Sequence, residues 1–312
     1  MDPAYRWTFL GLCAMAVVVV APRFDELAGL IRDRLGHETT PQHDQQSRDM
    51  LLDRQFDLGS GGTLTVEVPD GDVMVRTSPD SRASVQVVVS AHDRAWGRQV
   101  FERMEFAVRR SGDDLSVTAT SPRVQDNEWR DNRGVGVQVE ITLPQSFNLD
   151  VATSDGDIDI GDVAGRIELR TSDGDIVLGN VRGPALTVTT SDGDVSAASI
   201  AAERLAIQTH DGDVDVTVDS RSARIATGDG DIHLHLAAGG EVTLRTGDGD
   251  ITIYADPSLN ANVELRGEDV LVGPGFSLEG RVDRRGAQGQ LNGGGPLLVA
   301  ETGDGTISIR SR

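Results

Sequence analysis

An Asp-Gly-Asp tripeptide recurs six times at nearly constant spacing and brings two carboxylates to each copy. The first aspartates are 18 or 19 residues apart: Asp155, Asp173, Asp192, Asp211, Asp229 and Asp248. The second aspartates are Asp157, Asp175, Asp194, Asp213, Asp231 and Asp250. If the copies stack as neighbouring strands, like carboxylates lie about 4.8 Å apart. Each neighbouring pair then costs about 0.9 kcal/mol in water, so something must offset the repulsion.

Two kinds of chemistry can offset it. Ca²⁺ prefers flexible carboxylate and carbonyl oxygens and lines the turns of other Asp-Gly repeat solenoids, so these aspartates are a candidate calcium ladder. Alternatively, Asp-Gly serves only as a good turn former, and the charges point into water, screened by salt and by Arg170, Arg224 and Arg245. Apart from calcium, no cofactor is expected.

The residues around each turn follow one pattern, shown by Ile167, Leu169, Thr171, Asp173-Gly174-Asp175, Ile176 and Leu178. Alternating apolar residues predict half-buried strands, and Asp-Gly is expected to supply the positive φ of a tight turn. A unit this short cannot bury its apolar face alone. The repeat therefore predicts an all-β, single-stranded β-solenoid, a β-helix or β-roll, with 18–19-residue coils.

Aligning the units places like residues in columns. Two apolar columns are the predicted core: Leu149, Ile167, Leu186, Leu205, Ala223 and Val242, and Ile158, Ile176, Val195, Val214, Ile232 and Ile251. A third column contains Thr153, Thr171, Thr190, Thr209, Thr227 and Thr246. These threonines either exchange hydroxyl hydrogen bonds between coils or reflect simple β-propensity.

The same pattern extends beyond the six copies. Upstream, Asp70-Gly71-Asp72 forms an isolated unit, and Trp96, Val100, Phe101 and Met104 have helical spacing and could cap the stack. Downstream, residues 261–272 fit a decayed next coil. The pattern returns at residues 298–309, where Arg310 and Arg312 are expected to protect the last edge. The predicted organisation is a membrane anchor or signal segment (1–23), a stalk or linker (24–58), an irregular β region with a capping helix (59–148) and the Asp-Gly-Asp solenoid (149–312).

The N-terminal segment is uncharged from Trp7 to Pro22, which favours a retained membrane anchor over a cleaved signal peptide. Apolar residues at helical spacing then predict a short helical stalk. Arginine counts on the two sides of the segment favour a cytoplasmic body, whereas the signal-like start favours an extracytoplasmic one. The single cysteine, Cys13, excludes an intrachain disulfide.

Composition limits the function classes. A net charge of −21 argues against nucleic-acid binding, which requires clustered basic residues. The turns are too short to wall a substrate cleft and no catalytic motif is present, so we expect no enzyme activity. His233 and His235 should share an outward face beside Asp215 and Thr252, as an ordinary solvated surface and not a metal site.

The stretch from Gly289 to Pro296, followed by Thr302 to Ile307, resembles the closing signature of bacterial adhesin-like β-strand-repeat proteins, many known only as domains of unknown function. The resemblance covers roughly Ser60 to Arg312. It implies a β-solenoid, commonly behind an N-terminal membrane segment, linked to the cell envelope. It brings no catalytic residues, and family likeness alone is weak evidence of function.

The sequence therefore predicts a non-enzymatic, adhesin-like binding or scaffold protein, membrane-anchored with an extracytoplasmic body. Its outward strand residues would bind a glycan or an envelope protein, through Glu168, Arg170, Thr187, Thr189, Thr243 and Arg245. One alternative is a scaffold that polymerises end to end, as bactofilin-like cytoskeletal proteins do. Another is an envelope-stress accessory protein. Oligomeric state is left open.

Overall fold

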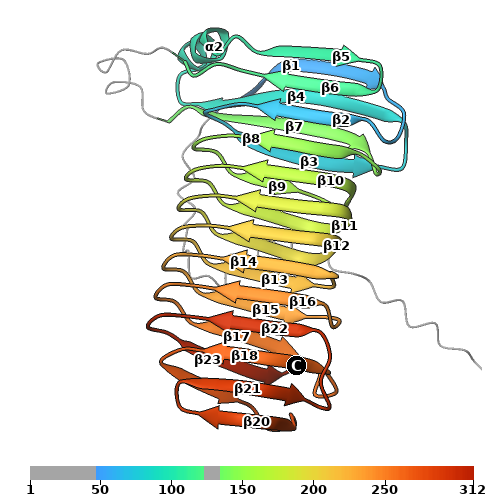
Figure 1. The fold of residues 1–312 in the computed structure, drawn as a ribbon. Helices are drawn as coiled ribbons and strands as arrows, with labels where there is room; N and C mark the ends of the chain where they lie inside the picture. The colour runs from blue at the N-terminus through green and yellow to red at the C-terminus, as the bar shows by residue number, and fades with distance from the viewer. Residues whose placement is uncertain (1–46, 123–133) are drawn as a thin grey trace, which may run out of the picture. The chain divides into compact units, whose positions relative to one another are not determined.

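The computed structural model describes residues 47–122 and 134–312. They form an all-β structure with 23 strands and one helix, which confirms the predicted class. The strands stack as coils with two faces, called here face A and face B (Figure 1). The predicted anchor (1–23) and residues 24–46 of the predicted stalk lie outside the described residues. Within the described ranges, no helix is long and apolar enough to span a bilayer.

Face A contains one strand from each coil, together with antiparallel strands at its ends. Its strands are β2 (Thr63–Glu67), β5 (Ala107–Ser111), β6 (Asp114–Thr118), β8 (Asn148–Ala152), β10 (Val163–Arg170), the second halves of β11 (Ile176–Thr189) and β12 (Val195–Gln208), β14 (Ser222–Ala226), β16 (Glu241–Arg245), β18 (Ala261–Arg266), β20 (Leu278–Asp283), β21 (Gly286–Leu291) and β22 (Leu297–Glu301).

Face B carries the complementary strand of each coil. Its strands are β1 (Ser47–Asp57), β3 (Asp72–Ser78), β4 (Arg82–Ala91), β7 (Gly136–Pro144), β9 (Ile158–Ile160), the first halves of β11 and β12, β13 (Val214–Val218), β15 (Ile232–Leu236), β17 (Ile251–Ala255), β19 (Asp269–Val272) and β23 (Thr306–Ser311). Strand β1 begins inside the range 24–58 that the sequence assigns to a stalk or linker.

Parallel pairing follows the predicted repeat. On face A, Ile167 lies opposite Leu149 and Leu186; on face B, Ile176 lies opposite Ile158 and Val195. Every member of the two predicted core columns is at most 3% exposed, so these columns are confirmed. The alternation therefore reports which side chains point inward between the two faces.

At the N-terminal end, the coil β2–β3 lies directly against β8–β9, although more than 60 residues separate them. The intervening chain adds β6 and β7 outside that coil and then antiparallel β4. Strand β1, which precedes β2 in the chain, pairs antiparallel with β4. Helix α2 (Arg94–Arg103) lies at this end (Figure 1). Asp93 caps it by accepting the Ala95 and Trp96 N–H groups, and buried Gly97 brings it close to β4.

At the other end, the spatial order departs from the sequence order. Residues 261–272 form a coil, β18–β19, as predicted, but it is not the next one in space: the last coil, β22–β23, lies between it and β16–β17. The physical reason lies in the turns. Residues 302–305 supply a complete Thr-Gly-Asp-Gly turn that can stack on both neighbours, whereas residues 266–269 lack the threonine.

This insertion also changes the edge strands. Strand β23 is flanked by β17 and β19, so Arg310 and Arg312 do not protect an edge as predicted. The outer strands are β19 and β20, and β20 pairs with β21 as an antiparallel hairpin. Arg284 in the hairpin turn donates a 2.5 Å hydrogen bond to Asp269 on β19. That bond lowers the pKa of Asp269 and fastens the hairpin to the stack.

Candidate functional site

The glycines of the Asp-Gly-Asp turns stack directly on one another. A Cβ built on Gly174 would lie 2.0 Å from the carbonyl oxygen of Gly156, and one on Gly193 would lie 1.9 Å from that of Gly174. None of the six glycines has a positive φ, so the prediction that they supply one is wrong. Glycine is required because any side chain would collide with the backbone of the preceding coil.

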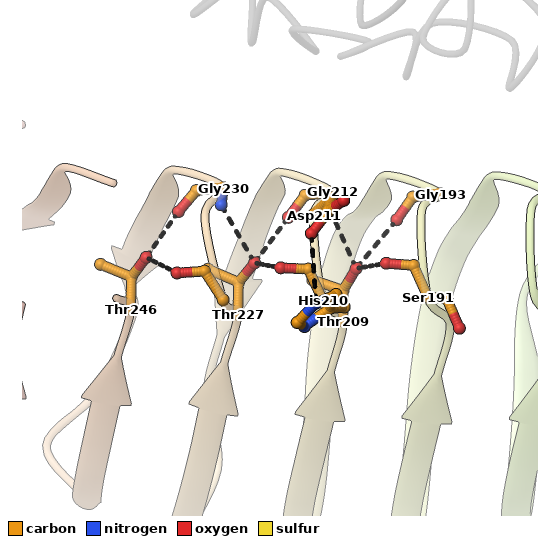
Figure 2. Close-up of polar contacts among 10 residues, drawn as sticks. Ser191, Gly193, Thr209, His210, Asp211, Gly212, Thr227, Gly230 and Thr246 are labelled. Atoms are coloured by element: carbon orange, nitrogen blue, oxygen red, sulfur yellow. Dashed lines mark hydrogen bonds and ion pairs between the residues drawn. The ribbon is translucent and has the colours of Figure 1, made fainter. Parts of the chain in front are cut away.

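The threonine column holds these turns in place (Figure 2). The Thr209 hydroxyl lies 3.1 Å from the Ser191 carbonyl oxygen and 3.3 Å from that of Gly193, both in the preceding coil. It also accepts the Gly212 N–H of its own turn, at 3.2 Å. The hydroxyls therefore bond to backbone and not to each other. Of the two expectations for this column, hydroxyl hydrogen bonds between coils are therefore present, with backbone carbonyl oxygens of the preceding coil as the partners.

The second aspartates form a continuous hydrogen-bonded column. In each coil the Asp N–H donates to Oδ1 of the second aspartate of the preceding coil: Asp194 N–H to Asp175 at 2.9 Å, and Asp213 N–H to Asp194 at 2.8 Å. The column starts at Asp72 and ends where the Thr306 N–H donates to Asp250. Charge-assisted bonds of this kind offset the repulsion between stacked carboxylates without a cation.

The first aspartates point into solvent. Asp155, Asp173, Asp192, Asp211, Asp229 and Asp248 are all exposed. The arginines expected to screen them do not contact them: Arg170 pairs with Asp150 and Glu168, Arg245 pairs with Glu301, and Arg224 pairs with no acid among the described residues. In the described part of the chain, no three His, Cys, Asp or Glu side chains are placed to hold one metal ion.

The two aspartates of one turn should therefore differ in their effect on stability. We expect Asp175→Ala to lower the free energy of unfolding by about 1–3 kcal/mol, because the Asp194 N–H loses its acceptor. Asp175→Asn keeps that acceptor and should change little, as should Asp173→Ala at the exposed position. Urea unfolding followed by circular dichroism measures the differences. Equal losses for Asp175→Ala and Asp173→Ala would contradict the assigned roles.

Calcium binding by the twelve aspartates stays a prediction. If the first aspartates hold Ca²⁺, adding it should raise the Tm of the chelator-treated protein, because an ion that binds only the folded state stabilises that state. Mg²⁺ at equal ionic strength is the matched control for screening. A Tm that is the same with Ca²⁺, with Mg²⁺ and with chelator would exclude the calcium ladder.

The two histidines share an outward face, as predicted. His233 lies opposite Asp215 and Thr252, and His235 lies opposite Tyr254, on face B. The His235 and Tyr254 rings stack with centroids 4.6 Å apart, and His235 Nε2 lies 3.7 Å from Asp215 Oδ1. These contacts join three adjacent coils, which makes the pair part of the surface packing.

Face A carries the predicted outward residues on β10, β11 and β16. Glu168 and Arg170 lie opposite Thr187 and Thr189, and Thr243 and Arg245 follow on β16. Sequence reasoning missed a second feature of this face, a shallow depression lined by Arg166, Arg204 and Arg224. The signal that could have found it is the column that contains Arg166, Ala185 and Arg204.

The sequence of residues 62–310 matches the family model described as Toastrack DUF4097. The chain belongs to this family. The match covers most of the described solenoid and confirms the resemblance to a family of domains of unknown function that residues 289–307 indicate. The Toastrack chain is also similar to solved structures, which fits its stack of short coils. No curated protein matches it.

Two of these structures illustrate the likeness. One is a "putative lipid binding protein" from Parabacteroides distasonis, with a TM-score of 0.50, 13% identity and coverage of 85% of this Toastrack chain and 97% of the other. Another is a "putative adhesin" from Bacteroides fragilis, with a TM-score of 0.49, 13% identity and coverage of 85% and 98%. At this identity the first likeness shows a shared fold only.

Proposed function

We propose that this protein is a non-enzymatic, adhesin-like binding protein of the bacterial cell envelope, and that face A is its binding surface. The observation that supports this is the division of roles among the repeats. The Thr, Gly and second Asp columns are engaged in backbone hydrogen bonds and close packing at one corner of the stack. The outward residues of β10, β11 and β16 remain available to a ligand.

The arrangement of face A suits an extended partner. Its strands run side by side in register, so outward side chains form straight rows at intervals of about 4.8 Å. Thr187, Thr189, Glu168 and Arg170 are exposed in these rows. Such a surface provides hydroxyl and charged groups for a glycan or an envelope protein. The structurally similar protein from Bacteroides fragilis, described as a "putative adhesin", is in keeping with that role.

The row of outward residues that contains Arg170, Thr189 and Arg245 tests the proposed binding surface. Purified full-length chain in detergent is screened on a glycan array, together with a variant carrying Arg170→Gln, Thr189→Glu and Arg245→Gln. We expect this variant to lose binding to the glycans that the parent binds. A control with Thr217→Glu on face B should still bind them. Loss of the glycans by the face B control alone would overturn face A as the binding surface, and no retained glycan at all would overturn the glycan as its ligand.

The polymerising scaffold is the main rival, and the N-terminal end of the stack argues against it. The outer strand β1 has a bulge between Met50 and Leu52, and the outer strand β5 carries Arg109 and Arg110. Bulges and charges on edge strands discourage pairing between molecules. We expect a monodisperse monomer by light scattering, whereas filaments in electron micrographs would favour the scaffold.

Membrane anchoring and an extracytoplasmic body remain part of the proposal. They rest on the uncharged segment from Trp7 to Pro22 and on the family resemblance. Protease accessibility in intact cells and spheroplasts tests them. An extracytoplasmic body should be cleaved in spheroplasts, and protection until the membrane is lysed would place it in the cytoplasm.

A further inference from the structure

The outward arginines on β10, β12, β14, β16 and β18 of face A fall into two groups. Arg170 lies 2.7 Å from Asp150, and Arg245 and Arg266 each lie 3.2 Å from Glu301. By contrast, the three exposed arginines on the neighbouring part of these strands, Arg166 on β10, Arg204 on β12 and Arg224 on β14, have no ion pair within the described ranges. The unpaired group is therefore a local positive site on a chain whose net charge is −21.

These three arginines line one shallow depression. Pairing between strands places Ala185 directly between Arg166 and Arg204, which sets the two arginine backbones about 9.6 Å apart at the usual strand spacing. Arg224 lies opposite Ala206 on the next strand of the stack. Small side chains thus form the floor, and the long arginine side chains stand around it.

The floor also carries hydroxyl groups. Thr187 on β11 lies between Glu168 on β10 and Ala206 on β12. Ser222 lies opposite Arg204, and Thr243 lies opposite Arg224 at the border of the depression. Guanidinium groups form two parallel hydrogen bonds with a carboxylate, and hydroxyls can both donate to and accept from sugar hydroxyls. One carboxylate, Glu241, lies at the border of the depression and limits how much negative charge a ligand can place there.

We propose that this depression binds an acidic polysaccharide, with the three arginines recognising carboxylate groups along the chain of sugars. This inference rests on the proposed function of face A and names its ligand class. The small residues Ala185, Ala206 and Ser222 lie on three adjacent strands, β11, β12 and β14, and the depression is open at the surface, so it accepts a linear polymer better than a compact ligand. A nucleic acid is disfavoured because three arginines neutralise few phosphates on a strongly acidic protein.

The test measures binding of the full-length chain in detergent to polygalacturonate at low ionic strength, with neutral dextran as the uncharged polymer. We expect binding to polygalacturonate that weakens with salt and little binding to dextran. A variant with Arg166→Gln, Arg204→Gln and Arg224→Gln should lose at least about tenfold in affinity, since each lost pair is a charge-assisted bond. A charge-matched variant with Arg54→Gln, Arg82→Gln and Arg310→Gln, all exposed on face B, should bind as the parent does.

Several outcomes would overturn the inference. Equal losses in the two arginine variants would mean that polygalacturonate senses only overall charge. Binding to inorganic phosphate or to phosphatidylglycerol vesicles, but not to polygalacturonate, would identify a phosphate group as the ligand. If the depression variant retains polygalacturonate while the Arg170, Thr189 and Arg245 variant loses its glycans, the depression is not the site and the function of face A still stands.

Discussion

Gly193→Ala is expected to lower the free energy of unfolding by about 3 kcal/mol or more, at the high end of overpacking costs. The new Cβ would lie 1.9 Å from the Gly174 carbonyl oxygen and 2.5 Å from its carbonyl carbon. Those atoms belong to backbone, which cannot rotate away as a side chain can. The coils must separate locally, and the Thr190 and Asp194 hydrogen bonds of the same turn weaken with them. Denaturant unfolding followed by circular dichroism measures the loss.

Two further variants separate the possible reasons for this loss. Asparagine tolerates positive φ, so Gly193→Asn would be well tolerated if the turn needed that backbone conformation. Because the restriction is the space for a Cβ, we expect Gly193→Asn to be as destabilising as Gly193→Ala. Gly239→Ala is the matched control, since its Cβ would approach no atom closer than 3.8 Å. A tolerated asparagine, or equal effects at Gly193 and Gly239, would contradict the close-approach explanation.

The repeat predicted the coil and the core because alternation reports side-chain direction at every residue. Ile167 and Ile176 are buried on opposite faces for that reason, and their partners 18 or 19 residues away follow from the period. The role of glycine was not predictable in this way. A glycine satisfies a positive-φ turn and a close backbone approach equally well, and only the distance to the preceding coil distinguishes them.

The order of the coils and the pairing of charges on face A were also beyond sequence reasoning. A coil with the complete turn can stack at any position among the coils. The sequence of residues 297–311 therefore does not predict that β22 pairs with β16 and β18. The position of β22 in the stack also decides which charged side chains form ion pairs. Glu301 reaches both Arg245 and Arg266 only because β22 lies between their strands, and Arg204 and Arg224 lie outside its reach. The column of Arg166, Ala185 and Arg204 can be read from the sequence, but the absence of an ion pair at these arginines within the described ranges emerged only from the structure.

Removal of residues 297–312 is expected to have the largest effect of all, because it removes an interior coil. Leu298, Ile307 and Ile309 are at most 1% exposed, and their burial contributes about 1.5–3 kcal/mol each. Strand β19 pairs only with β23 and would lose its neighbour, while β18 would keep only β21. We expect residues 261–291 to become sensitive to protease while the coils up to β17 remain folded, since repeat stacks are stabilised by nearest neighbours.

Limited proteolysis with mass spectrometry should then yield a resistant fragment that ends near Asp256, just after β17. A chain lacking only Arg312 is the control, because it loses one backbone hydrogen bond to Ala255 and should resist protease as the parent does.

One alternative fold would close the gap that the missing coil leaves between β16–β17 and β18–β19. Val242 and Val263 both lie opposite Leu298, so β18 could shift by one coil and pair with β16 directly. Such a shift would bring the incomplete turn at residues 266–269 against the turn of β16–β17 without a stacking threonine. Continued protection of residues 261–291 would show that the incomplete turn suffices, and that the last coil is not what joins them to the stack.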